Sequence, residues 1–215
     1  MKAALLAFVM AAIVAAGCSK RAPEESGSEP FGVQEAPSRP ADEDAGETLD
    51  GQRFLDRYGG QTTDELIGLA GEYRIDSVVL AFEEAIQRKA ARQPISKEES
   101  YVLAVEALER EVNNGGYSQF FLNSSNEFAA IIVEALREIG CPKTAEITQG
   151  AISALHIEGE PTAGKVEAVA RSEDEGILNS LGAFDDRYYG NDEPIAERLF
   201  EWIKQNRTRI RIGLP

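Results

Sequence analysis

The 215-residue sequence contains few of the residues on which metal sites depend. It has one histidine, His156, and two cysteines, Cys18 and Cys141. Metal sites usually combine several His, Cys or carboxylate ligands at defined spacings. Glu158 and Glu160 lie near His156, but this cluster is too thin to hold an ion. We therefore predict no metal site and no cofactor.

Signatures of common enzyme classes are also missing. The chain has no Gly-x-Ser-x-Gly elbow, no phosphate-binding loop and no dinucleotide fingerprint. A histidine-based catalytic triad would have to use His156, because there is no other histidine. These absences favour a protein that is not an enzyme.

Strand patterns and internal repeats are absent as well. Apolar residues recur instead at the three- and four-residue spacing of a helix, most clearly in one stripe: Phe128, Ile131, Ile132, Ala135, Leu136 and Ile139. Two capping boxes, Thr62-x-x-Glu65 and Ser96-x-x-Glu99, mark helix starts. Residues 157–164 are predicted to form a loop. The sequence predicts an all-α fold, a single compact multi-helix domain.

Positive charge is scarce, with 22 Lys and Arg against 37 Asp and Glu and a formal net charge of −15. Such acidity disfavours nucleic acids and anionic lipid surfaces, because like charges repel. We predict no direct binding to nucleic acid and regard a basic protein as a compatible partner. The alternative is that the charge serves only to keep the protein soluble.

The first eighteen residues lack the length of a membrane span. The apolar run Ala3–Ala16 covers 14 residues, where a spanning helix needs about 20 and a signal-peptide core about 7 to 15. Lys2 before the run and Ala16-Gly17-Cys18 after it resemble a bacterial lipoprotein signal. The resemblance implies cleavage before Cys18, a lipid on its sulfur and a membrane-anchored protein at the cell envelope, periplasmic or on the outer face. An uncleaved signal anchor and an ordinary secretory signal are the alternatives.

The composition then divides the chain into segments. Residues 1–17 form the predicted signal peptide. Residues 18–50, the lipidated cysteine and an acidic stretch rich in Pro, Ser and Gly, have too few large apolar side chains to fold and are predicted to be a disordered tether. A helical extension over 51–95, a main helical domain over 96–207 and a short tail over 208–215 follow.

Cys141 would have no partner within the chain if Cys18 carries lipid. It lies in Gly140-Cys141-Pro142, at a predicted helix break. We predict a buried thiol that packs as a small apolar residue. A reactive or intermolecular thiol is the alternative.

The segment 113–123 is the first candidate site. Its side-chain amides would offer hydrogen bonds to a ligand. Its aromatic rings, including that of Phe121, would offer a contact surface. Alternatively, Asn and Gly end a helix, Gln119 and Asn123 bond backbone ends, and the aromatics fill the core; we favour this structural interpretation. The candidate binding residues are Asn113, Asn114, Gly115, Gly116, Tyr117, Gln119, Phe120 and Asn123.

A second candidate lies at 185–189. Asp185, Asp186 and Arg187 precede Tyr188 and Tyr189, and paired carboxylates support acid–base chemistry when burial separates their pKa values. Adjacent residues of a helix do not face each other. An ion-paired, solvated face is therefore the favoured interpretation.

Two segments together resemble the bacterial DNA-mimic protein family. The first is 103–125, with the core Glu111-Val-Asn-Asn-Gly-Gly-Tyr-x-Gln-Phe-Phe-x-Asn; the second is 181–202, with Asp186-Arg-Tyr-Tyr and Asp192-Glu-Pro. The resemblance covers residues 96–207. It implies a small helical domain, permits a homodimer, and suggests an acidic surface that occupies a DNA-binding protein.

An exported, tethered domain would not meet cytoplasmic transcription regulators. Our leading hypothesis is therefore a membrane-anchored lipoprotein without catalytic activity, whose acidic helical domain is a protein-interaction module. One alternative is an envelope hydrolase with a pocket near residues 113–123 or 185–189. Another is a cytoplasmic DNA mimic that binds a DNA-binding protein, which requires that Cys18 is not processed.

Overall fold

The structure, a computed structural model, describes residues 51–213. This part of the chain forms eight α-helices and one 3₁₀ helix and contains no strand, so the predicted all-α fold is confirmed. The predictions for Cys18 and the tether lie outside the described residues. The helices are α1 (Thr63–Gly68), α2 (Ile75–Ala90), α3 (Lys97–Leu122), η1 (Ser124–Phe128), α4 (Ile132–Glu138), α5 (Pro142–Ser153), α6 (Ala163–Ala170), α7 (Glu175–Tyr189) and α8 (Ile195–Gln205).

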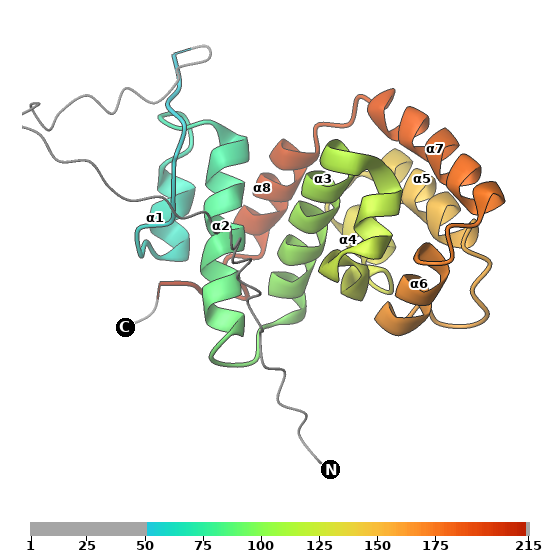
Figure 1. Cartoon of the computed structure of the whole chain (residues 1–215). Coiled ribbons are helices and arrows are strands. Elements are labelled where there is room, and N and C mark those ends of the chain that lie inside the picture. Colours follow the sequence, from blue (N-terminus) through green and yellow to red (C-terminus); the bar gives the residue numbers. More distant parts are fainter. Residues whose placement is uncertain (1–50, 214–215) are drawn as a thin grey trace, which may run out of the picture. The chain divides into compact units, whose positions relative to one another are not determined.

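Helix α3 lies at the centre of this arrangement. It packs against α2, α4, α6 and α7, and α8 packs against α2. In Figure 1, α1, α2 and α8 lie to one side of α3, and α5, α6 and α7 lie to the other. None of the helices in the described range combines the length and apolarity that a membrane span requires.

The two predicted capping boxes are present. Thr62 and Glu65 exchange side-chain-to-backbone hydrogen bonds at the start of α1, and Ser96 and Glu99 do the same at the start of α3. Each box satisfies backbone N–H groups that the first turn of a helix leaves unpaired. The carboxylate of Glu99 is completely buried and also accepts the Lys89 ammonium at 2.6 Å.

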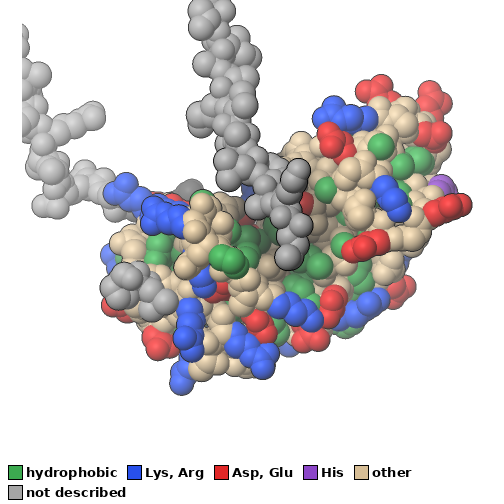
Figure 2. Space-filling model, turned by 90° about the horizontal axis from the view of Figure 1, so that it is seen from below, with side chains coloured by type: hydrophobic (Ala, Val, Ile, Leu, Met, Phe, Trp, Pro, Cys, Tyr) green, Lys and Arg blue, Asp and Glu red, His purple; other side chains and the backbone are tan. Residues whose placement is uncertain are grey.

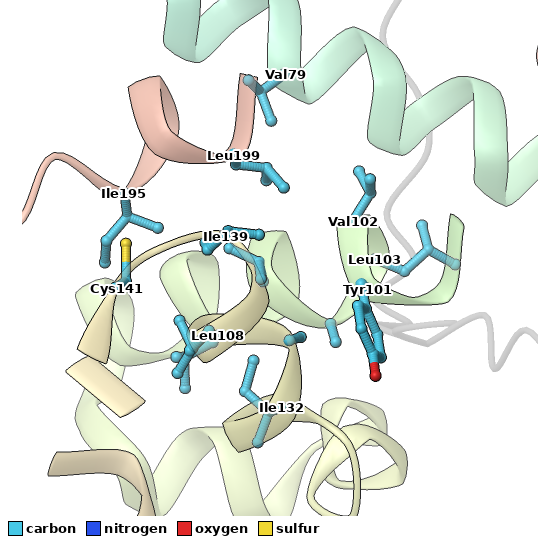
Figure 3. Packing of buried hydrophobic residues seen from close by; sticks show 14 of the residues in the cluster. Val79, Tyr101, Val102, Leu103, Leu108, Ile132, Ile139, Cys141, Ile195 and Leu199 are labelled. Carbon is cyan, nitrogen blue, oxygen red and sulfur yellow. The ribbon is translucent and has the colours of Figure 1, made fainter. Parts of the chain in front are cut away.

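One core runs through the described residues. Val79 of α2, Leu108 of α3 and Leu199 of α8 are all completely buried, and Figure 3 shows them converging with neighbouring apolar side chains. Full burial of a side chain of this size contributes about 1.5–3 kcal/mol. Helix α2 therefore shares its core with α3, although the division at residue 95 stays a prediction.

Two helix predictions are corrected. The apolar stripe predicts a helix from Phe128, but Ser124–Phe128 form a 3₁₀ helix and α4 begins only at Ile132. The buried Asn126 amide donates to the Phe121 carbonyl at 3.2 Å, which favours a tight turn in place of an α-helical start.

Helix α6 was not predicted, and the predicted loop over 157–164 overlaps its first residues. Val166 is its single buried side chain, so the sequence carries little helical periodicity. Thr162 at its N-terminus makes no side-chain cap. Both signals from which a helix is normally recognised are therefore weak here.

Candidate functional site

The first candidate segment contains a kink in α3. Gly115 (φ −165°, ψ 24°) and Gly116 (φ 74°, ψ −174°) leave the helical conformation, and the helix resumes at Tyr117. The Asp185 carboxylate of α7 accepts the Tyr117 backbone N–H at 2.7 Å. A Cβ atom at Gly116 would lie 2.3 Å from the Asp185 carboxylate. Where the sequence predicts the end of a helix, the structure thus has a kink. The carboxylate that caps the helix after the kink comes from a residue distant in the sequence.

Gln119 and Asn123 do not bond backbone ends, so this part of the structural interpretation is wrong. Their side-chain amides donate to the Glu111 carboxylate at 2.9 and 2.7 Å, and the Ser125 hydroxyl donates at 3.1 Å. Burial opposes ionisation of Glu111, but these hydrogen bonds outweigh it and lower its pKa. The amides therefore hold a buried carboxylate of their own chain.

The aromatic residues of the segment lie in the core. Tyr117, Phe120 and Phe121 are completely buried, and the Tyr117 hydroxyl lies 2.8 Å from that of Thr148. Tyr117 also packs against Phe121 with ring centroids 6.0 Å apart. These side chains fill the core, as the structural interpretation predicted, and offer no open contact surface.

Half of the predicted binding residues are exposed. Asn113, Asn114, Gly115 and Asn123 are exposed, whereas Gly116 is buried and Gln119 is half-buried. Of the exposed amides, that of Asn123 is already bonded to Glu111, and those of Asn113 and Asn114 lie at the exposed turn. The exposed amides can form hydrogen bonds but supply neither a nucleophile nor a proton-transferring group.

The side chains of the second candidate segment, on α7, form hydrogen bonds to α3. Tyr188 donates its hydroxyl to the Glu109 carboxylate, and the Tyr189 hydroxyl donates to the Val112 carbonyl at 2.5 Å. Asp186 and Arg187 are exposed. The predicted solvated face therefore applies to Asp186 and Arg187, whereas Asp185 binds the kink.

Glu193, from the second family-like segment, caps another helix. Its carboxylate accepts the backbone N–H groups of Lys143 and Thr144 at 3.0 and 2.8 Å, in the first turn of α5. A negative charge at a helix N-terminus is stabilised by the unpaired N–H groups there. The Asp192-Glu-Pro motif therefore joins α5 to the start of α8.

Helix α3 also carries a buried carboxylate that no sequence pattern indicates. Glu106 is 6% exposed, and burial, together with Glu83 on α2 and Glu109 on α3, raises its pKa to about 8. Arg110 opposes the shift, whereas Asp76 adds to it. No spacing signal identifies such a residue, because its neighbours on α2 are distant in sequence.

We expect Glu106→Gln to stabilise the protein most above pH 8. A folded-state pKa above the unfolded value of 4.5 favours the protonated form, so stability falls as pH rises from about 4.5 to about 8. The neutral amide removes this loss, roughly 2–4 kcal/mol at pH 8, and changes little at pH 4. Urea unfolding across this pH range measures it. Glu138→Gln, at an exposed position, is the control; an equal pH profile for both variants would refute the expectation.

The structure buries Cys141 at the start of α5. Burial, with the nearby Glu193 carboxylate adding to it, raises the pKa of its thiol to about 12. A thiol is reactive as its thiolate. This position therefore supports the prediction of a buried thiol over that of a reactive one.

Iodoacetamide should not modify Cys141 in the folded protein at pH 8. The thiol is both inaccessible and protonated, so we expect labelling only after addition of denaturant. Peptide mass mapping distinguishes Cys141 from Cys18. Complete labelling of Cys141 within minutes under native conditions would contradict its burial.

His156 lies on the surface, at the turn after α5. No group of three or more His, Cys, Asp or Glu side chains within residues 51–213 is arranged to hold a metal ion. The neighbourhood of His156 therefore adds no metal centre to the sites considered above.

A groove of about 700 Å³ lies between the second half of α3, α6 and the start of α7. Its apolar lining includes Leu122 and Leu178, whose exposed fractions, 43% and 41%, are high for large apolar side chains. Three consecutive acids, which we call the rim acids, also line it: Glu173, Asp174 and Glu175. We call this feature the acidic groove. Its volume is in the range of ligand-binding sites.

The rim acids differ in their roles. Asp174 accepts the Ile177 backbone N–H at 3.0 Å and caps α7. Glu173 and Glu175 form no ion pair with the described residues, and Arg171 in the same lining pairs with Glu167 at 2.8 Å. The groove thus combines an apolar floor with two uncompensated carboxylates. In the sequence the acids indicated only a helix start, because the apolar groove beside them forms only in the fold.

A family model described as DMP19-like protein matches residues 93–206. This range covers α3 to α8 and includes both family-like segments and the acidic groove. No curated protein and no solved structure matches the chain.

Proposed function

The chain belongs to the DMP19-like protein family, and we propose that it is a membrane-anchored lipoprotein whose acidic helical domain binds a basic segment of another protein. The family indicates an acidic helical protein of the DNA-mimic type. It is not known as a family of enzymes. The acidic groove is the feature that supports this proposal most.

The charge and surface of the groove favour one kind of partner. Residues 93–206 carry 21 acidic and 9 basic side chains, a net charge of −12. Exposed apolar side chains next to charged ones are also found at protein–protein interfaces, which have an apolar core and a polar edge. A segment with apolar side chains on one face and Lys or Arg at its edges would fill the floor and neutralise Glu173 and Glu175.

The compartment that we propose rests on the signal-like sequence around Cys18. A lipid on its sulfur and the acidic stretch after it would hold the domain at the envelope, and the partner would then be an envelope protein. Stable anchoring takes two or more acyl chains. The cytoplasmic DNA-mimic alternative requires an unprocessed chain, so the two proposals make different predictions for the mature protein.

Intact mass and cell fractionation test the anchor. We expect a membrane-bound protein that lacks residues 1–17 and carries acyl chains. An unmodified, soluble chain that begins at Met1 would contradict the proposed anchor and support the cytoplasmic alternative. This outcome would leave the groove proposal itself standing, with a cytoplasmic partner.

The hydrolase alternative finds little support among its candidate residues. Gln119 and Asn123 donate to Glu111, and Tyr117 is buried. Asn113 and Asn114 are exposed, but an amide is neither an effective base nor an effective nucleophile. We therefore propose that the domain binds and does not catalyse.

Site-specific photocrosslinking tests the groove in its own cells. A photoreactive residue in place of Leu178 in the full chain should form an adduct with a basic protein, and high salt should reduce its yield. Glu173→Gln/Glu175→Gln should abolish most of the adduct and leaves the Asp174 cap intact.

The matched control removes two exposed carboxylates outside the groove. Glu138→Gln/Glu146→Gln changes the net charge equally and should leave the adduct unchanged. Equal loss in both double variants would mean that overall charge attracts the partner and that the groove has no specific role. Absence of any adduct at low salt would also contradict the proposal.

A further inference from the structure

A second cavity, of about 360 Å³, lies where the end of α2 meets the segment after α8. Four basic side chains line it: Arg88, Lys89, Arg92 and Arg211. We call it the basic pocket. All four residues lie outside the family match at 93–206, whereas Gln93, which also lines the pocket, is the first residue of that match.

The charge around the pocket is opposite in sign to that of the chain. Residues 51–92 and 207–213 together carry 9 basic and 7 acidic side chains, a net charge of +2, whereas residues 93–206 carry −12. Figure 2 shows Lys and Arg side chains gathered on the half of this face formed by α2 and the C-terminal segment. Net charge is an average, so the acidity of the whole chain conceals this region.

Two of the four cations are already neutralised. Arg88 forms an ion pair with Glu84, four residues earlier in α2, and the Lys89 ammonium lies 2.6 Å from the buried Glu99 carboxylate. Their charges serve the fold and contribute little free positive charge to the pocket.

Arg92 and Arg211 are not neutralised. Neither guanidinium has a carboxylate of residues 51–213 within ion-pair distance. Arg211 donates its Nε–H to the Thr208 carbonyl at 2.9 Å, and both terminal nitrogens remain available. The pocket therefore holds two uncompensated positive charges.

The segment that carries Arg211 is held in place from both sides. The Arg211 backbone N–H donates to the Glu99 carboxylate at 2.8 Å, and its carbonyl accepts the Lys89 ammonium at 3.0 Å. Ile210 and Ile212 on either side are buried. The Arg211 side chain is therefore exposed, while its backbone is held in place. Binding of a ligand here requires little further ordering of the backbone.

We propose that the basic pocket binds a phosphate group. The planar guanidinium fork matches the oxygens of a phosphate and can donate two parallel hydrogen bonds to it. A phosphate monoester carries close to two negative charges at pH 7, which would balance the Arg92 and Arg211 charges. A purely structural explanation is that the cations at the C-terminal end of α2 complement the helix dipole. This explanation accounts neither for Arg211, which is not on α2, nor for the cavity itself.

The phosphate group has two sources: a small phosphorylated molecule in solution or the headgroup of an anionic phospholipid. In either case the site is independent of the acidic groove, because the two share no lining residue.

Calorimetric titration of the full chain in neutral detergent with inorganic phosphate tests the first source. We expect saturable binding that Arg92→Gln/Arg211→Gln weakens at least tenfold. Arg137→Gln/Arg198→Gln removes two exposed arginines that lie outside both the pocket and the acidic groove and should bind phosphate as the wild-type chain does. Circular dichroism should show equal helicity in all three proteins, since the substituted side chains are exposed.

Mixed micelles test the second source. Phosphatidic acid, whose headgroup is a phosphate monoester, should raise the melting temperature of the full chain above its value with the diester phosphatidylcholine, and Arg92→Gln/Arg211→Gln should lose this shift. Binding in either experiment that depends on Arg92 and Arg211 supports the proposal and identifies the source. No binding in either experiment, or equal losses in the pocket and control variants, would overturn it.

Discussion

Gly116→Ala should destabilise the folded protein by roughly 3–5 kcal/mol. Gly116 has a φ of 74° and a ψ of −174°, a conformation that is essentially restricted to glycine. The new Cβ would also lie 2.3 Å from the Asp185 carboxylate, so the hydrogen bond from Tyr117 N–H to Asp185 would have to break. Urea unfolding followed by circular dichroism measures the loss.

Gly182→Ala is the matched control. Gly182 is an exposed residue within α7, and an added Cβ would meet no atom within 4 Å. Alanine at this position should leave stability unchanged or raise it by up to about 1 kcal/mol, because alanine is the better helix former. If Gly116→Ala and Gly182→Ala unfolded at the same urea concentration, the kink would not depend on the glycine conformation.

Glu111→Gln should cost about 2–4 kcal/mol at pH 7. Its carboxylate accepts hydrogen bonds from Gln119, Asn123 and Ser125. An amide of the same size would turn an N–H group toward these donors and leave at least one of them unpaired. Thermal and urea unfolding measure the effect, with the exposed Glu138→Gln as a variant that should be neutral.

The cost of Glu111→Gln should depend on pH. The folded-state pKa of Glu111 is lowered from 4.5, so its ionised form contributes stability above that value. This contribution is lost as pH falls through the folded-state pKa. The difference between wild type and variant should therefore shrink on acidification. A difference that stayed constant down to acid pH would show that the carboxylate charge does not matter.

The sequence predicted the features of this fold that depend on neighbouring residues. The capping boxes at Thr62 and Ser96 each involve four consecutive residues, and both are present. The stripe that ends at Ile139 also identified buried positions, although its helix starts later than predicted. Local patterns carry this information because capping and helical periodicity act within a few residues.

Features that join distant segments could not be predicted in the same way. Asp185 reaches Tyr117 across 68 residues, and Lys89 reaches the Arg211 carbonyl across 122. The sequence therefore placed Asp185 on a solvated face. The net charge of the whole sequence is also strongly negative, so it gives no indication of the local cluster of cations in the basic pocket.

The residues that carry the family resemblance mainly hold the fold together. Glu111 binds the amides of its own segment, and Glu193 caps α5. Gly116 forms the kink in α3, and Glu111 holds the residues after the kink, among which Leu122 lines the acidic groove. On this account the family motif determines the shape of the binding surface, and the rim carboxylates and exposed leucines make the contacts.

Fluorescence anisotropy of a labelled basic amphipathic helical peptide, titrated with the full chain, tests whether the acidic groove binds such a segment. We expect saturable binding that weakens with salt. The affinity should fall about tenfold in Glu173→Gln/Glu175→Gln, while Glu138→Gln/Glu146→Gln should bind as wild type does. Equal affinity in the two double variants would contradict a specific role of the acidic groove.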